Sequence, residues 1–141
     1  MNSGYLYIES LAQPESAYHL AMSLEKPEQG QLQAGHQLVY IAKFRDIDAA
    51  FMHASGKLRR RCKHLDTSTF VTRLAMMVAV IEANVLKHER IWLADVLSAD
   101  EMEVLRTQTE SLKKQAANQS LIWKMVGIAG LVIFFLLSIS V

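Results

Sequence analysis

The sequence predicts an all-α fold: a small helical bundle whose long final helix continues into a single C-terminal transmembrane span. Apolar residues recur every three to four positions along most of the chain, which is the period of amphipathic helices. A helix-capping signature at 98–101 opens a segment that contains neither Gly nor Pro before residue 121. The chain then ends in a strongly apolar run at 121–141. Together these observations predict helices throughout and an anchored C-terminus.

We expect three successive segments. They are a helical cytoplasmic domain at 1–97, a helical stalk at 98–120 that either packs on this domain or stands apart from it, and a transmembrane tail anchor at 121–141. Once the anchor is set aside, about 120 residues remain, which is enough for one domain. The 15 basic and 14 acidic residues give a net charge of +1, without the basic excess of many nucleic-acid-binding chains. The single cysteine, Cys62, cannot form an intramolecular disulfide, which fits a reducing compartment.

The first helix is expected at about 14–26. Pro14 fits the first helical position, and Ala17, Leu20 and Leu24 follow at helical spacing. The sequence PEQG at 27–30 then predicts a loop. The next apolar segment, LVYIAKF at 38–44, is rich in residues that favour β-strands, so it is compatible with a strand or with the start of a helix. We favour a helix, because no second strand is evident to pair with it.

Two further helices are expected before residue 98. After Asp46, an apolar stripe marks an amphipathic helix; its members are Ile47, Phe51, Ala54, Leu58, Cys62 and Leu65. From 70 to 86, apolar residues occur on nearly every face, including the run LAMMVAVI at 74–81, and the helical period continues to about residue 97. That run is too short to span a membrane, and it predicts the central, buried helix of the bundle.

The last helix is expected to begin at Ser98 and to run without interruption into the anchor. The Ser98 hydroxyl and the Glu101 carboxylate can cap each other's backbone N–H groups. An apolar stripe on this helix would be exposed unless another helix covers it; its members are Met102, Leu105, Leu112 and Ala116. The covering helix would belong to a partner protein, to a second copy, or to the central helix at 70–97 folded back antiparallel.

The apolar run at 121–141 predicts the membrane anchor. As a helix it would be roughly 30 Å long, which matches the hydrocarbon core of a bilayer. Trp123 and Lys124 would lie at the membrane interface, and Lys113 and Lys114 place the basic side N-terminal to the span. These features predict a single-pass protein with a cytoplasmic N-terminal domain. They do not distinguish a bacterial inner membrane from a eukaryotic organelle membrane.

A basic cluster is the strongest local charge feature and the candidate binding site for an anionic partner. Its five cations fall within seven residues: Lys57, Arg59, Arg60, Arg61 and Lys63. Anionic lipid headgroups are one partner it could take. Nucleic acid is disfavoured, because no aromatic residues are interleaved with the cations. The alternative interpretation is a solvated helix face with no partner.

No catalytic signature, cofactor motif or metal-ligand spacing is evident, and the five histidines are far apart in the sequence. We therefore expect a protein that is not an enzyme and that needs no cofactor or metal. The predicted function is that of a tail-anchored membrane adaptor, or a small subunit of a membrane-bound assembly, which binds another protein through its cytoplasmic helical domain. The alternative is a membrane-tethered binder of anionic lipid or nucleic acid that acts through 57–63.

Overall fold

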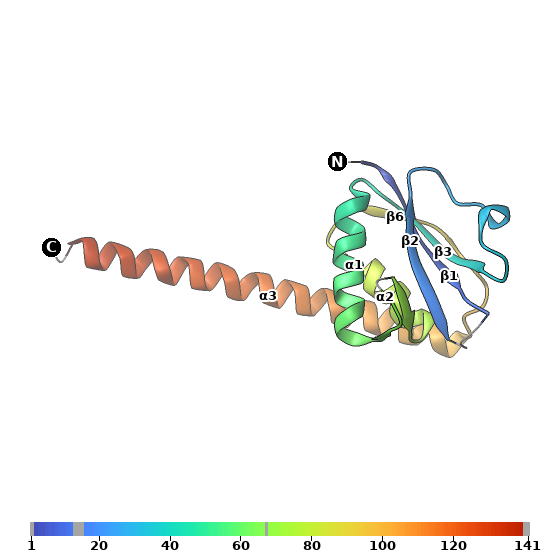
Figure 1. The fold of residues 1–141 in the computed structure, drawn as a ribbon. Helices are drawn as coiled ribbons and strands as arrows, with labels where there is room; N and C mark the ends of the chain where they lie inside the picture. The colour runs from blue at the N-terminus through green and yellow to red at the C-terminus, as the bar shows by residue number, and fades with distance from the viewer. Residues whose placement is uncertain (1, 13–15, 67, 140–141) are drawn as a thin grey trace.

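The computed structural model describes residues 2–12, 16–66 and 68–139. An antiparallel β-sheet carries helices on one face, and one long helix projects away from this domain (Figure 1). The predicted all-α bundle is therefore wrong, because the fold is mixed α/β. The part of the chain at 1–97 that was expected to be helical contributes every strand of the described sheet.

In the described residues the sheet has six strands, in the order β4-β5-β2-β1-β3-β6, and each neighbouring pair is antiparallel. The strands are β1 (Gly4–Ser10), β2 (Ala17–Ser23), β3 (Gln37–Phe44), β4 (Lys63–His64), β5 (Thr69–Val71) and β6 (His88–Leu93). Strand β1 alternates as expected for a sheet with one face covered: Leu6 and Ile8 are buried under the helices, whereas Tyr5 and Tyr7 are half-buried on the outer face.

The described helices are the short 3-10 turn η1 (Gln29–Gln31), α1 (Ile47–Arg61), α2 (Leu74–Glu82) and α3 (Ala99–Ile139). Helix α1 begins where Asp46 accepts a hydrogen bond from the backbone N–H of Ala49 at 3.1 Å. Three residues of the predicted stripe, Ile47, Ala54 and Leu58, are buried against the sheet and α2. The amphipathic helix expected after Asp46 is thus present, although it ends at Arg61.

Helix α2 lies in the centre of the core, between α1 and α3. Nearly all of its side chains are buried, including Met77, Val78 and Ile81, which explains why its sequence is apolar on every face. Leu105 and Leu112 of α3 belong to the same core cluster. The first part of α3 is therefore integral to the domain.

The capping signature at the start of α3 is confirmed. Glu101 Oε2 accepts a hydrogen bond from the backbone N–H of Ser98 at 2.9 Å, and the Ser98 hydroxyl accepts one from the backbone N–H of Glu101 at 3.3 Å. From 117 onward every described side chain of α3 is exposed. The second half of α3 thus extends beyond the domain (Figure 1).

Three expected helices are wrong. The segment expected as a helix at 14–26 contains β2, and its first position, Pro14, lies outside the described residues. The segment at 38–44 belongs to β3, and the segment at 70–97 divides into the end of β5, α2 and β6. Strand β2 pairs with the adjacent β1 and with the distant β5, and β3 pairs with β1 and with the distant β6. Such pairing overrides a local helical period.

The predicted membrane anchor is also contradicted. Within the described ranges, none of the helices combines the length and the apolar character that crossing a membrane requires. The charge of Lys124 interrupts the apolar run near its N-terminal end. This finding contradicts the predicted tail anchor and the single-pass topology. It also contradicts the predicted membrane localisation with a cytoplasmic N-terminal domain.

Candidate functional site: a basic groove between α1 and α3

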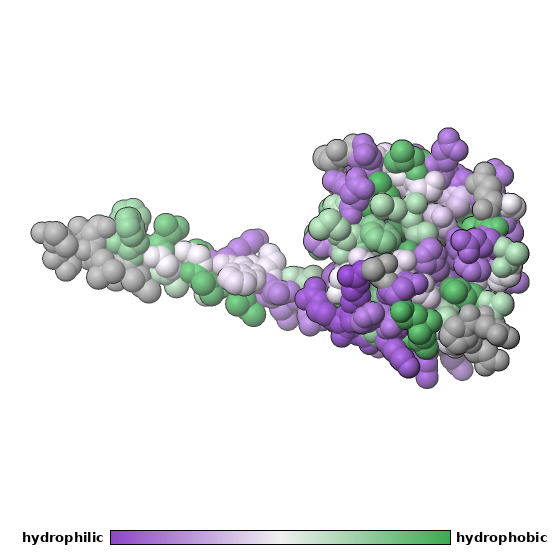
Figure 2. Space-filling model, viewed as in Figure 1, coloured by the Kyte–Doolittle hydropathy of each residue, from purple (hydrophilic) through white to green (hydrophobic). Residues whose placement is uncertain are grey.

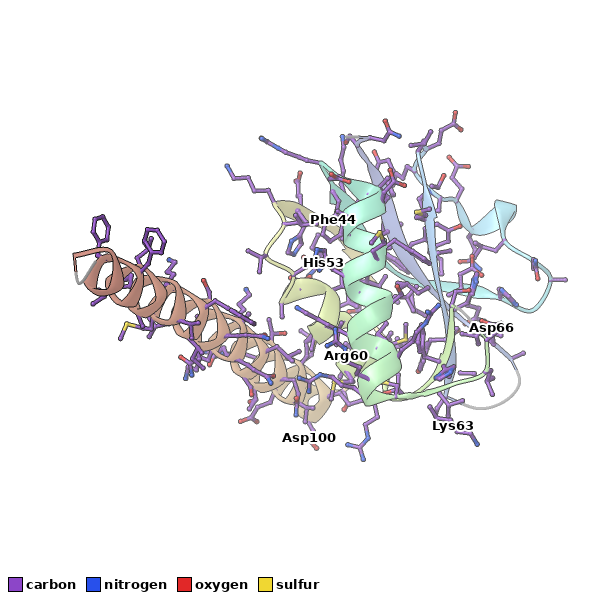
Figure 3. The ribbon with its side chains drawn as sticks, turned by 60° about the vertical axis from the view of Figure 1, so that its left-hand side comes forward. Phe44, His53, Arg60, Lys63, Asp66 and Asp100 are labelled. Atoms are coloured by element: carbon purple, nitrogen blue, oxygen red, sulfur yellow. The ribbon has the colours of Figure 1, made fainter. Side chains whose placement is uncertain are left out.

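The structure divides the predicted basic cluster. Lys57, Arg60 and Arg61 line one groove at the C-terminal end of α1, whereas Arg59 and Lys63 do not line it. In Figure 3, Arg60 lies beside α3, and Lys63 lies beyond the end of α1. The spacing i, i+3, i+4 on one helix explains this grouping, because such residues share a face. Three of the five predicted binding residues thus converge on one place.

The opposite wall of the groove is α3. It contributes two apolar residues of the predicted stripe, Leu112 and Ala116, and two amides, Gln115 and Gln119. Nη2 of Arg61 donates a hydrogen bond to Oε1 of Gln115 at 2.8 Å, which links the two helices across the groove. The groove has a volume of about 420 Å³. It therefore combines cationic and amide donors with two apolar side chains.

No acidic side chain among the described residues neutralises the positive charge of this groove. Among the residues that the structure describes, Lys57, Arg60 and Arg61 form no ion pair. Partial burial lowers the pKa of Lys57, and the nearby charges of Arg61 and Arg60 lower it further. The three cations repel one another, and a bound anion would relieve that repulsion.

The predicted helix-packing stripe is placed mostly inside the domain. Leu105 and Leu112 are only 4% and 5% exposed, and the early part of α3 packs against α2. Ala116 is half-buried at the groove, and Met102 is exposed. The chain itself thus covers Leu105 and Leu112, and the covering helix is the short α2 and not one helix spanning 70–97.

Beyond the groove, the projecting part of α3 carries exposed apolar side chains. Figure 2 shows hydrophilic residues gathered where α3 leaves the domain and hydrophobic residues on much of its projecting part. Trp123, which was assigned to a membrane interface together with Lys124, lies on this part and is 68% exposed. The large exposed hydrophobic residues here are Leu121, Ile122, Trp123, Met125, Val126, Ile128, Leu131, Val132, Phe134 and Phe135.

A second polar cluster, not predicted from the sequence, lies on the outer face of the sheet. Nδ1 of His36 is 2.6 Å from Oε2 of the buried Glu9, and Nε2 of His19 is 3.0 Å from the hydroxyl of Ser68. These residues come from β1, β2, the loop before β3 and the turn before β5, so no sequence spacing announces the cluster. A pocket of about 610 Å³ lies beside Glu9, His19 and His36.

The order Ser68, His19, Glu9 resembles a nucleophile, base and orienting acid, but the surrounding geometry does not support acyl transfer. Nδ1 of His19 is 3.7 Å from the Glu9 carboxylate, which is too long for a hydrogen bond. The backbone N–H groups of Ser68 and Thr69 both donate to Oδ1 of Asp66, so neither is available as an oxyanion donor. We assign this cluster to holding the loop before β3 against the sheet.

A third cluster ties α2 to the sheet around the Glu82 carboxylate. Oε1 of Glu82 accepts hydrogen bonds from the Tyr40 hydroxyl at 2.8 Å and from Nε of Arg90 at 2.7 Å, and Nε2 of His88 lies 3.7 Å from Oε2. Burial alone would raise the pKa of Glu82, but its interactions with His88, Arg90 and Tyr40 outweigh burial and lower the pKa to about 2. The interaction with Glu82 raises the pKa of His88, against the opposing effect of burial.

This cluster predicts a maximum of stability at mildly acidic pH. Because the pKa of Glu82 falls from 4.5 to about 2 on folding, its contribution is complete above about pH 5 and is lost as the pH falls towards 2. Because the pKa of His88 is raised, its contribution is complete below 6.5 and is lost as the pH rises through the folded-state value. Urea unfolding of the full chain should show that the free energy of unfolding falls on both sides of this pH range. Glu82→Gln should reduce both falls, whereas Glu110→Gln, at an exposed position of α3, should reduce neither.

Comparison with known proteins adds no relative: the scan against family models, the search of curated proteins and the search of solved structures each found no match for this chain. Its class is therefore defined by its own architecture. It is an α/β domain with an antiparallel sheet, a basic groove at the junction of α1 and α3, and a projecting apolar helix.

Proposed function

We propose that this chain is a non-enzymatic adaptor, or a small subunit of a protein assembly, which binds its partner through the projecting part of α3. One observation carries the proposal: from Leu121 to Phe135 the described apolar side chains of α3 are exposed, and the domain covers none of them. Exposed contiguous apolar surface of this kind marks an interaction site. The partner that fits is a protein that contributes several apolar helices.

The distribution of the apolar residues favours several surrounding helices over a single second copy. A two-helix contact needs only one apolar stripe, which recurs every three to four residues. Here Leu121, Ile122, Trp123, Met125 and Val126 follow one another almost without interruption, so they lie on different faces of the helix. A helix that is apolar on every face is stable when it is surrounded. The domain would then remain outside the assembly, with its basic groove accessible.

Site-specific photo-crosslinking in cells, followed by reconstitution, tests this proposal. A crosslinker at Val132 should trap one protein, whereas the same group at Asp48, an exposed residue of α1, should not. The purified pair should then form a complex of fixed stoichiometry, and Leu131→Asp should abolish it without lowering the helix content of the domain. Crosslinks only to a second copy of this chain, or only to lipid, would refute the assignment to a partner protein.

A further inference from the structure

We propose that the groove between α1 and α3 is a binding site for a phosphate-bearing ligand, whose phosphate is held by Lys57, Arg60 and Arg61. The observation behind it is that three cations, which form no ion pair among the described residues, converge with two amides on one groove. This inference does not depend on the proposed partner of the projecting helix. The residues of α3 that line the groove all precede residue 120, whereas the proposed partner binds 121–135.

A phosphate fits this arrangement better than a single carboxylate. A phosphate group carries up to two charges and several acceptor oxygens, so it can satisfy three cations at once. Arg60 and Arg61 offer planar guanidinium groups that can donate two parallel hydrogen bonds. Arg61 is already oriented by its hydrogen bond to Gln115, which reduces the conformational entropy that it loses on binding.

The two apolar residues that line the groove, Leu112 and Ala116, indicate that the ligand has a second, less polar part. Leu112 and Ala116 line the groove from the same face of α3 as Gln115 and Gln119, so a ligand held at the cations could rest its remaining atoms on them. The groove volume of about 420 Å³ is in the usual range for a small-molecule site. A soluble phosphate ester and a phospholipid headgroup share this chemistry, and the experiment must distinguish them.

The lining residues argue against nucleic acid as the ligand. None of them is aromatic, so no base could stack in the groove. The two cluster residues outside the groove, Arg59 and Lys63, do not extend its lining into a longer basic track. A compact phosphate group is therefore favoured over a polymer backbone.

Titration of the full-length chain with inorganic pyrophosphate, followed by calorimetry, is the first measurement. We expect saturable binding of one pyrophosphate per chain that weakens as salt is added. In parallel, the chain is mixed with phosphatidylcholine vesicles with and without phosphatidic acid. Binding of pyrophosphate identifies a soluble ligand, and binding only to the vesicles that contain phosphatidic acid identifies a headgroup; either result supports the site.

Matched pairs of variants separate the groove from the general charge of the cluster. Arg60→Gln with Arg61→Gln should weaken binding by about tenfold or more, since both lose charge-assisted hydrogen bonds to the phosphate. Arg59→Gln with Lys63→Gln removes the same charge outside the groove and should change the affinity by less than about twofold. Ala116→Phe fills the groove without changing its charge and should also abolish binding. Circular dichroism of each variant verifies that the domain remains folded.

Several results would overturn the proposal. Equal losses from the two charge pairs would show that only diffuse attraction operates. Undiminished binding by the Ala116→Phe variant would place the ligand elsewhere. Absence of saturable binding to both pyrophosphate and vesicles containing phosphatidic acid, or tight binding only to single-stranded nucleic acid or to an acidic peptide, would also reject a phosphate site in this groove.

Discussion

Leu105→Asp should unfold the domain. Leu105 is only 4% exposed in the core cluster that α3 shares with α2, so the substitution buries a carboxylate and removes an apolar side chain at the same time. The expected loss is about 4 kcal/mol or more of the free energy of unfolding, a large fraction of the stability of a small domain. Circular dichroism of the full chain should show loss of the folded state. A size measurement should show more than the dissociation of an oligomer.

The control for this substitution is Leu121→Asp on the projecting part of α3. Leu121 is exposed, so the same chemical change there should alter the free energy of unfolding by less than about 0.5 kcal/mol. A Leu105→Asp variant that kept its fold and lost only an associated molecule would show that the stripe contacts a partner. That result would contradict the packing of Leu105 in the core of its own domain.

Phe44→Ala should be nearly as damaging. Phe44 is fully buried at the end of β3, and its ring stacks on that of His88 in β6 with centroids 4.8 Å apart. Truncation to Ala leaves a cavity in the core beside the His88 ring, and the expected loss is about 3–5 kcal/mol. Urea unfolding followed by circular dichroism measures it.

Phe44→Leu is the matched control, because it retains most of the buried apolar volume. We expect it to cost less than about 2 kcal/mol, so that the two variants bracket the contribution of the ring. Equal losses for the two variants would show that stacking on His88, and not the filled volume, determines the effect.

Helices α1 and α3 could be predicted from the sequence because their signals are local. Asp46 caps the first turn of α1, and Ser98 and Glu101 cap the first turn of α3, within four residues of each helix start. The apolar period of each helix also remains readable over several turns. This period does not reveal which helix covers the stripe of α3. The covering helix, α2, is only nine residues long, so its own period is too short to be recognised.

The sheet could not be predicted in the same way. Strand β3, at 37–44, is buried along most of its length, so its sequence lacks the alternation that marks a half-exposed strand. Its partners, β1 and β6, are distant in sequence, and the absence of an adjacent strand favoured the incorrect assignment to a helix. Strand β1 does alternate, half-buried Tyr5 and Tyr7 with buried Leu6 and Ile8.

The candidate site was predicted in composition but not in geometry. The cluster at 57–63 is evident from its charge, whereas the selection of Lys57, Arg60 and Arg61 depends on where α3 crosses α1. The polar cluster around Glu9 and His19 has no sequence signal, because cross-strand pairing creates it. Charge is a local property of the chain, but convergence is a property of the fold.

The position of α3 in the core also determines the order in which the chain can complete its fold. Strands β1, β2 and β3 precede every long helix, but α2 keeps an uncovered apolar face until Leu105 and Leu112 reach it. These contacts cannot form until the chain has continued through β6 into α3. A nascent or proteolysed chain that ends before residue 105 therefore exposes α2 to other chains. We expect such fragments to aggregate, because the core is completed only by α3, the last helix of the chain.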